Sequence, residues 1–216
     1  MIMSDMTEIE REELISTAKA AINDDPIAWF DELYDLANRD SSMIPWARMS
    51  PNPIMMDWVK GNHPGGKALI VGCGLGDDAV GLEDLGFQVT AFDISQQCID
   101  WCKERFPKSS VDWQVADILE PPQQWLEQFD LVVEIHILQA IPDGGIRELA
   151  AKNLPKLLDK DGFLLCIGRL DNGGQMIQSP PWPLKEGWLK DSFRRLKMLG
   201  FTQFSYQESI DVTRYY

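Results

Sequence analysis

Three glycines occupy alternate positions directly after a run of four apolar residues. The stretch reads LIVGCGLGDD over residues 69–78, and its glycines are Gly72, Gly74 and Gly76. Glycine inside a regular element costs roughly 0.5–1 kcal/mol relative to alanine, so this spacing indicates a backbone that bends sharply or approaches a ligand closely. In doubly wound α/β proteins, the turn after the first strand is the usual cradle for a cofactor.

The spacing of the glycines separates two classes of cofactor. A dinucleotide-binding loop has the pattern G-x-G-x-x-G, with pyrophosphate at the N-terminus of the next helix. Counted from Gly72, the third glycine would fall where the chain has Asp77, and Asp78 follows. Two carboxylates there would repel a pyrophosphate but are compatible with a cationic ligand. The spacing G-x-G-x-G therefore favours an adenosine cofactor with a sulfonium and an amino-acid tail.

Alternating strand and helix patterns must position this loop. We expect strands at 67–72, 87–94, 111–118, 129–138 and 163–170, helices at 77–86, 95–106, 121–128, 144–158 and about 185–199, and closing segments at 201–210 and 212–216. Ser95 is the expected N-cap of its helix. Such alternation produces right-handed βαβ units and a mainly parallel sheet. The predicted fold class is α/β, with a doubly wound, mainly parallel seven-stranded sheet of the Rossmann-like kind.

The first 60 residues have a different pattern. We expect an acidic amphipathic helix over 7–24 and a second helix that begins near Asp25–Pro26. Three prolines then interrupt residues 41–53, before a helix over 54–61 and a turn at 62–66. Residues 1–60 are predicted to form a helical cap within the same domain as a cofactor-binding region at 61–216.

Composition restricts the partners. Thirty-four acidic against 20 basic residues give a net charge of −14. A protein that grips a phosphate backbone needs a basic surface, so nucleic acids and anionic membranes are disfavoured partners. The acidic first residues lack the pattern of a signal peptide, and no run approaches the ~18 apolar residues of a membrane span. We expect a cytoplasmic monomer or homodimer that acts on a small molecule.

The cysteines do not show a metal-binding pattern. Cys98 and Cys102 stand one helical turn apart, and no CxxC motif accompanies the chain's two histidines. A structural zinc site needs four ligands at characteristic spacings. Free buried thiols are the better interpretation, and no metal is expected.

In order along the chain, these motifs resemble those of the class I S-adenosylmethionine-dependent methyltransferases. The pieces that carry the resemblance are VGCGLGD at 71–77, VTAFDIS at 89–95, VADI at 115–118, FDLVVE at 129–134 and LLDKDGFLLCI at 157–167. Three glycines alone would be a weak signal, and an acidic residue after the second strand is shared with dehydrogenases. Five pieces in the right order and spacing are a strong one.

The resemblance implies S-adenosyl-L-methionine as cofactor and assigns residues to it. In the family, the first loop runs under the methionine part of the cofactor, which implicates Gly72, Cys73, Gly74 and Gly76. The acidic residue that accepts both ribose hydroxyls corresponds to Asp93, which is followed by Ile94. A carboxylate suits this role because it accepts two charge-assisted hydrogen bonds. Asp117 and Ile118 match the positions that receive the adenine, although Asp117 has a second interpretation as the cap of a turn.

Glu134 and His136 follow at the end of the fourth expected strand, where this fold brings the methyl acceptor. Side chains at i and i+2 of a strand share a face, so both are expected on one wall of the site. Histidine titrates near neutral pH, which suits a general base, and Glu134 is a second catalytic candidate as well as a cofactor ligand. The alternative for His136 is a residue that only shapes the pocket, since many methyl acceptors need no base.

The segment IPWARMSPNP at 44–53 is similar to one in the thiopurine and thiol or halide methyltransferase branch. There, a tryptophan of the N-terminal cap packs against the cofactor, which corresponds to Trp46. This chain departs from part of that branch, because Ala47 stands where an aspartate commonly follows the tryptophan. The alternative for Trp46 is a hydrophobic clasp between cap and domain. Trp182 in SPPWPL likewise either faces the acceptor or packs internally.

The predicted function is transfer of a methyl group from S-adenosylmethionine to an S, N or O nucleophile of a small molecule. The sulfonium supplies the leaving group, so the protein mainly aligns the atoms and excludes water. Two alternatives stay open: an NAD-binding oxidoreductase, which Asp77 disfavours, and a non-catalytic S-adenosylmethionine-binding protein, because no residue is an obligatory catalyst.

Overall fold

The computed structural model describes residues 16, 29–62, 65–173, 180–205 and 212–216. The chain divides into a first unit, residues 1–65 with 72–117, and a second unit, residues 66–71 with 118–216. Apart from residue 16, the helix expected over 7–24 lies outside the described residues, and so does the predicted start of the next helix. The division into a cap at 1–60 and a domain at 61–216 stays a prediction.

Within the described residues, seven strands form one sheet in the order β3-β2-β1-β4-β5-β7-β6. Parallel pairing joins β2 to β3, β1 to β4 and β4 to β5, whereas β7 is antiparallel to both β5 and β6. The strands are β1 (Gly66–Val71), β2 (Phe87–Asp93), β3 (Asp112–Val115), β4 (Phe129–Ile135), β5 (Leu158–Arg169), β6 (Gln203–Phe204) and β7 (Arg214–Tyr215). This mainly parallel, seven-stranded α/β sheet confirms the predicted fold class.

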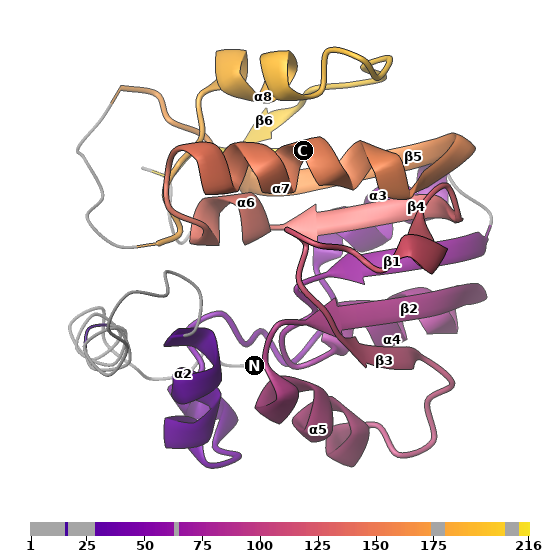
Figure 1. Cartoon of the computed structure of the whole chain (residues 1–216), viewed down its shortest axis with the longest axis vertical. Helices are drawn as coiled ribbons and strands as arrows, with labels where there is room; N and C mark the ends of the chain where they lie inside the picture. Colours follow the sequence, from indigo (N-terminus) through magenta and orange to yellow (C-terminus); the bar gives the residue numbers. More distant parts are fainter. Residues whose placement is uncertain (1–15, 17–28, 63–64, 174–179, 206–211) are drawn as a thin grey trace. The chain divides into compact units, whose positions relative to one another are not determined.

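In the first unit, helices pack on β2 and β3. Helix α4 (Asp77–Asp84) contacts β2, and α5 (Gln96–Arg105) contacts both strands. Helix α2 (Trp29–Ala37) lies beside α5 (Figure 1). Ser95 is the N-cap of α5 as predicted, because its Oγ accepts a hydrogen bond from Cys98 N at 3.1 Å. The contacts between α2 and α5 hold α2 next to the helix that follows β2.

The remaining helix of the first unit follows the proline-rich segment. A short 3-10 helix, η1 (Ser41–Met43), precedes irregular chain, and α3 (Pro53–Asn62) begins after Asn52. Asn52 Oδ1 accepts hydrogen bonds from Ile54 N at 3.0 Å and Met55 N at 3.3 Å, which satisfies two of the free N–H groups at the start of α3. The helix predicted at 54–61 is therefore present and slightly longer.

The second unit has its core on β1, β4 and β5. Side chains of β1 and β4 that point to either face are buried, including Leu69, Leu131 and Val132. Burial on both faces is typical of a central parallel strand. Helix α7 (Gly145–Leu157) packs against β4 and β5 and lies along them in Figure 1.

The start of β5 differs from the prediction. The strand was expected over 163–170, but β5 already begins at Leu158. Phe129 of β4 pairs with Leu158 and Leu131 pairs with Phe163, so residues 159–162 bulge out of the ladder. A Cβ at Gly162 would lie 2.5 Å from the carbonyl oxygen of Phe129. Only glycine fits this close approach of two backbones.

Several other predicted elements were too long. The strand expected over 111–118 is only β3, and the helix expected over 121–128 is the 3-10 helix η2 (Gln123–Trp125), which two prolines precede. Helix α8 (Glu186–Ser192) ends early, because the chain beyond it forms turns such as Leu196 N to Phe193 O at 2.8 Å. The strand predicted over 129–138 ends at Ile135, and helix α6 (Ile137–Ala140) follows.

Candidate functional site

The loop after β1 has the backbone that its glycines predict. Gly74 and Gly76 have φ of +52° and +88°, in the left-handed region that side chains disfavour. A Cβ at Gly76 would lie 2.7 Å from Cη2 of Trp113 and 3.1 Å from Sγ of Cys102. Both the sign of φ and the packing therefore require glycine at position 76.

Asp93, the last residue of β2, is tied to this loop. Its Oδ2 accepts a hydrogen bond from Gly74 N at 3.2 Å, and its Oδ1 accepts one from Ser95 N at 3.2 Å. The side chain is buried, and this burial raises the pKa of Asp93 to about 6, although the two backbone donors act in the opposite direction. Ile94 follows and is half-buried. The glycine loop and the carboxylate thus form one hydrogen-bonded arrangement.

Trp46 lies against the same loop. Its Cδ1 and Nε1 are each 3.5 Å from the position of a Cβ on Gly74. Nε1 donates a hydrogen bond to Tyr34 Oη at 3.0 Å, and the indole makes edge-to-face contacts with Trp29, Phe30 and Tyr34 of α2. An aromatic face of α2 therefore fixes Trp46 beside the glycine loop.

The two carboxylates at the start of α4 are both engaged. Arg105 at the end of α5 donates to both oxygens of Asp77, at 2.8 and 3.0 Å, and also to the carbonyl oxygen of Leu75. Asp78 accepts a hydrogen bond from Asn52 N at 2.5 Å, and burial raises its pKa to about 6. The ion pair with Arg105 balances the charge of Asp77. Repulsion of a pyrophosphate is therefore a weaker argument against a dinucleotide cofactor than the sequence indicated. The stronger argument is that Asp77 stands where the pattern G-x-G-x-x-G requires its third glycine.

The adenine candidates lie after β3. Asp117 is half-buried and belongs to the first unit, where the preceding Ala116 N donates to Asp93 O at 3.1 Å. Ile118 belongs to the second unit and is buried, and its carbonyl oxygen accepts a hydrogen bond from Asn153 Nδ2 at 2.8 Å. Their roles toward a ligand stay predictions.

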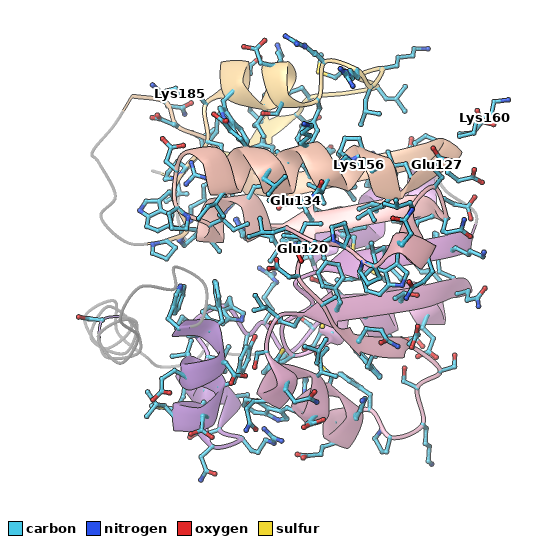
Figure 2. The ribbon with its side chains drawn as sticks, in the orientation of Figure 1. Glu120, Glu127, Glu134, Lys156, Lys160 and Lys185 are labelled. Atoms are coloured by element: carbon cyan, nitrogen blue, oxygen red, sulfur yellow. The ribbon has the colours of Figure 1, made fainter. Side chains whose placement is uncertain are left out.

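In the second unit, Glu134 projects from β4, where Figure 2 labels it. Its Oε2 accepts hydrogen bonds from Ile137 N at 3.0 Å and Leu138 N at 3.3 Å, so the carboxylate caps the start of α6. Its Oε1 is buried and has no hydrogen-bond partner among the described residues. Burial raises the pKa of Glu134 to about 7, while the two backbone donors and the thiol of Cys166 favour the charged form.

His136 does not share a strand face with Glu134, contrary to the expectation. Strand β4 ends at Ile135, and His136 has a left-handed backbone with φ of +63°. Its Nδ1 lies 2.8 Å from Oε1 of Gln139. That oxygen also accepts Arg169 N at 2.8 Å, and Gln139 Nε2 donates to Arg169 O, which fixes the orientation of the amide. Nδ1 of His136 is therefore the donor, and Nε2 is its basic nitrogen.

Trp182 lies near α6, the helix that contains Gln139. Its backbone N donates to Gln139 O at 2.9 Å, and the guanidinium of Arg147 is 5.9 Å from the centre of its ring. The loop that contains Trp182 is thereby attached to α6, two residues of which also contact Glu134.

Comparison with known proteins now adds to this geometry. Residues 68–162, which contain the glycine loop, Asp93 and Glu134, match the family model described as "Methyltransferase domain". Over these residues, the chain is similar to a methyltransferase domain. Residues 1–67, with Trp46 and the aromatic face of α2, lie outside the matched range.

The relatives that the chain matches act on different atoms, according to their names. The chain is 28% identical over 131 residues to "Probable thiol methyltransferase 2" of Arabidopsis thaliana, covering 59% of this chain and 58% of the relative. It is 31% identical over 121 residues to "Ubiquinone biosynthesis O-methyltransferase" of Xanthomonas campestris pv. campestris (strain B100), covering 52% and 50%. The chain therefore matches between one half and three fifths of the length of these relatives.

A solved structure has the same fold over more of the chain. The N-methyltransferase NodS from Bradyrhizobium japonicum WM9, in complex with S-adenosyl-l-homocysteine, superposes with a TM-score of 0.64 at 19% identity, covering 86% of this chain and 96% of that one. At this identity, the likeness supports the fold alone. No helix in the described part of the chain is long and apolar enough to cross a membrane.

Three residues of this site were not identified from the sequence. Nothing in the sequence singled out Tyr34, yet its hydroxyl accepts the indole hydrogen bond of Trp46. Arg105 carried no signal except its place in the last turn of a helix, and Gln139 gave no signal at all. The structure brings together Trp46, Gly74 and Asp93 in the first unit, and Glu134 with the start of α6 in the second.

Proposed function

We propose that this chain is an S-adenosylmethionine-dependent methyltransferase that acts on a small molecule with a nucleophilic S, N or O atom. The observation that carries the proposal is the bond between Asp93 and Gly74: a buried carboxylate held by the loop of a methyltransferase domain. Each carboxylate oxygen accepts one backbone donor and the Cys98 thiol also acts on the group, which leaves lone pairs for the ribose hydroxyls.

The residues present fit this cofactor. In the proposal, Asp93 and Ile94 receive the ribose, Asp117 and Ile118 the adenine, and Trp46 packs on the cofactor from the cap. The loop of Gly72, Cys73, Gly74 and Gly76 lies under the methionine part. Glu134 Oε1, buried and without a partner among the described residues, is suited to accept a hydrogen bond from an ammonium group.

The chemistry that the cofactor supplies when bound is a methyl group on a sulfonium leaving group. The chain's own residues bind and orient the reactants and exclude water, which supplies rate through proximity and alignment. His136 is the proposed general base, because Gln139 fixes the tautomer in which Nε2 accepts a proton. The basic nitrogen would serve a thiol or hydroxyl acceptor, which must lose its proton.

The net charge of −14 supports a small-molecule acceptor and neither nucleic acid nor an anionic membrane as partner. The proposal includes a cytoplasmic location and a monomer or homodimer as the functional form.

Calorimetry with S-adenosylhomocysteine, S-adenosylmethionine and NAD tests the first part. We expect binding of both adenosyl compounds and no heat from NAD; tight NAD binding with no response to the other two would refute the proposal. Incubation with S-adenosylmethionine and a panel of small thiols, amines and phenols then tests catalysis. Formation of S-adenosylhomocysteine above the background of an Asp93→Ala variant is the expected result. Cofactor binding with no turnover across the panel would favour a non-catalytic binding protein.

A further inference from the structure

Three buried thiols meet beneath the glycine loop. Cys73 comes from the loop itself, whereas Cys98 and Cys102 lie one turn apart on α5. Their Sγ atoms all lie within 4.8 Å of one another. The side chains are 8%, 0% and 0% exposed, so solvent is excluded from the group. We refer to these three residues as the thiol cluster.

The thiol cluster surrounds the carbonyl oxygen of Gly74, and the Cys98 thiol also interacts with the carboxylate of Asp93. The carbonyl oxygen of Gly74 lies 2.9 Å from Cys98 Sγ, 3.0 Å from Cys102 Sγ and 3.7 Å from Cys73 Sγ. A carbonyl has two lone pairs and thiols are weak donors, so this one oxygen cannot satisfy all three S–H groups. The cluster is therefore a convergent set of sulfur atoms and more than ordinary apolar packing.

We propose that Cys73, Cys98 and Cys102 form a binding site for one soft, thiophilic metal ion, and that Cu(I) is the ion that fits. Sulfur ligands select soft ions over Mg²⁺ or Ca²⁺. Zinc in structural sites takes four ligands, and the group of ligand atoms among the described residues consists of three sulfurs. Cu(I) accepts three thiolates in a trigonal arrangement. On binding, the ion forms three Cu–S bonds, and the three S–H protons leave to solvent.

A cation, Arg105, stands next to the cluster, and it shares its charge with Asp77. Arg105 follows Cys102 by three residues on α5, on the same side of the helix. Its guanidinium donates to the carbonyl oxygen of Leu75, the residue after Gly74, as well as to Asp77. Helix α5 thus carries two of the three sulfurs and also Arg105, which binds the glycine loop.

The fourth cysteine offers a matched control. Cys166 lies on β5 in the second unit, is half-buried and does not belong to the cluster. Under reducing, oxygen-free conditions, the full chain would be titrated with Cu(I) against the chromogenic chelator bicinchoninate. We expect one ion per chain. Cys73→Ser, Cys98→Ser and Cys102→Ser should each lower the affinity by at least about tenfold, the lower limit seen when residues around a metal site are changed. Cys166→Ser should leave the affinity unchanged.

A second measurement does not depend on how the variants fold. X-ray absorption at the copper edge of the loaded wild-type chain should show three sulfur neighbours and no nitrogen or oxygen neighbour. Two sulfur neighbours, a mixed shell, affinity that survives in all three cluster variants, or affinity that is lost in Cys166→Ser would each overturn the proposal. The test requires neither S-adenosylmethionine nor a methyl acceptor, so its result is independent of the proposed function.

Discussion

The indole N–H of Trp46 donates to the hydroxyl of Tyr34 at 3.0 Å, and the edge of the same indole rests on Gly74. This relationship joins the aromatic face of α2 to the loop that follows β1. It is compatible with both sequence interpretations of Trp46, because a residue can fasten the cap and flank the cofactor at once. A pair of variants separates the two roles.

Trp46→Phe and Tyr34→Phe remove the same hydrogen bond, but only Trp46→Phe removes the indole. We expect Tyr34→Phe to lower the free energy of unfolding by about 0.5–1.5 kcal/mol, the net value of a hydrogen bond, without changing the affinity for S-adenosylhomocysteine. Trp46→Phe should also weaken that affinity, by about 0.5–1.5 kcal/mol for the lost aromatic contact. Calorimetry and thermal melts measure both quantities. Equal affinities of the two variants would leave Trp46 as a clasp only.

Asp93→Ala should weaken binding of S-adenosylmethionine by about 2–4 kcal/mol, because two charge-assisted hydrogen bonds are lost and water recovers part of the loss. The matched control is Asp84→Ala, which removes an exposed carboxylate from α4 in the same unit. That control should bind as the wild type does. If Asp93→Ala retains its fold by circular dichroism and binds within twofold of the wild type, another residue holds the ribose.

The sequence predicted the site best where backbone geometry and residue type are coupled. Glycines at 74 and 76 indicated a turn with positive φ, and strand–helix alternation predicted the parallel sheet on which Asp93 ends β2. The sequence also predicted a local hydrogen bond, the N-cap that Ser95 forms at the start of α5.

The contacts between segments that are distant in the sequence could not be predicted from it. Asp77 and Arg105 are 28 positions apart in the sequence, and the residues around each of them do not indicate that the two form an ion pair. The thiol cluster likewise joins Cys73 to α5 without any metal-binding spacing. The end of β4 was misplaced because His136 has a left-handed backbone, which the apolar pattern of 129–138 does not encode.

Glu134 should make the stability of the fold depend on pH. Its pKa is raised by burial from the usual value near 4.5 to about 7, so the folded state holds a proton that the unfolded state has released. Stability should therefore fall as the pH rises through this window, by up to about 3 kcal/mol, and level off above it. Asp78 and Asp93, with pKa values raised to about 6, contribute a decline that ends at lower pH.

Glu134→Gln should therefore abolish the decline between about pH 6 and pH 7 and keep the part at lower pH. Urea unfolding at a series of pH values measures this. Glu127→Gln, which changes an exposed glutamate labelled in Figure 2, should leave the profile intact. A wild-type curve that is flat from pH 5 to pH 8 would contradict the assignment.

The tautomer of His136 can be observed directly. Since Gln139 Oε1 accepts from Nδ1, the proton of the neutral ring should be on Nδ1. The chain has only two histidines, so His63→Ala leaves one imidazole in the nitrogen–proton NMR spectrum. Gln139→Leu should transfer the proton to Nε2 and lower turnover more than it raises KM. A wild-type spectrum with the proton on Nε2 would remove the basis for a general base at this position.

The bulge in β5 divides that strand into a short section at Leu158 and a longer section that begins at Phe163. Leu158 holds one pair with β4, and the ladder that leads toward Glu134 starts again only at Phe163. Between them, residues 159–161 are exposed, and Lys160 extends away from the ribbon in Figure 2. Chain added at such a point lengthens the excursion without altering the register on either side. We therefore expect the peptide bond between Lys160 and Asp161 to accept a fluorophore tag or a new pair of termini. A change at this point should leave in place the section of β5 that pairs with β4 near Glu134.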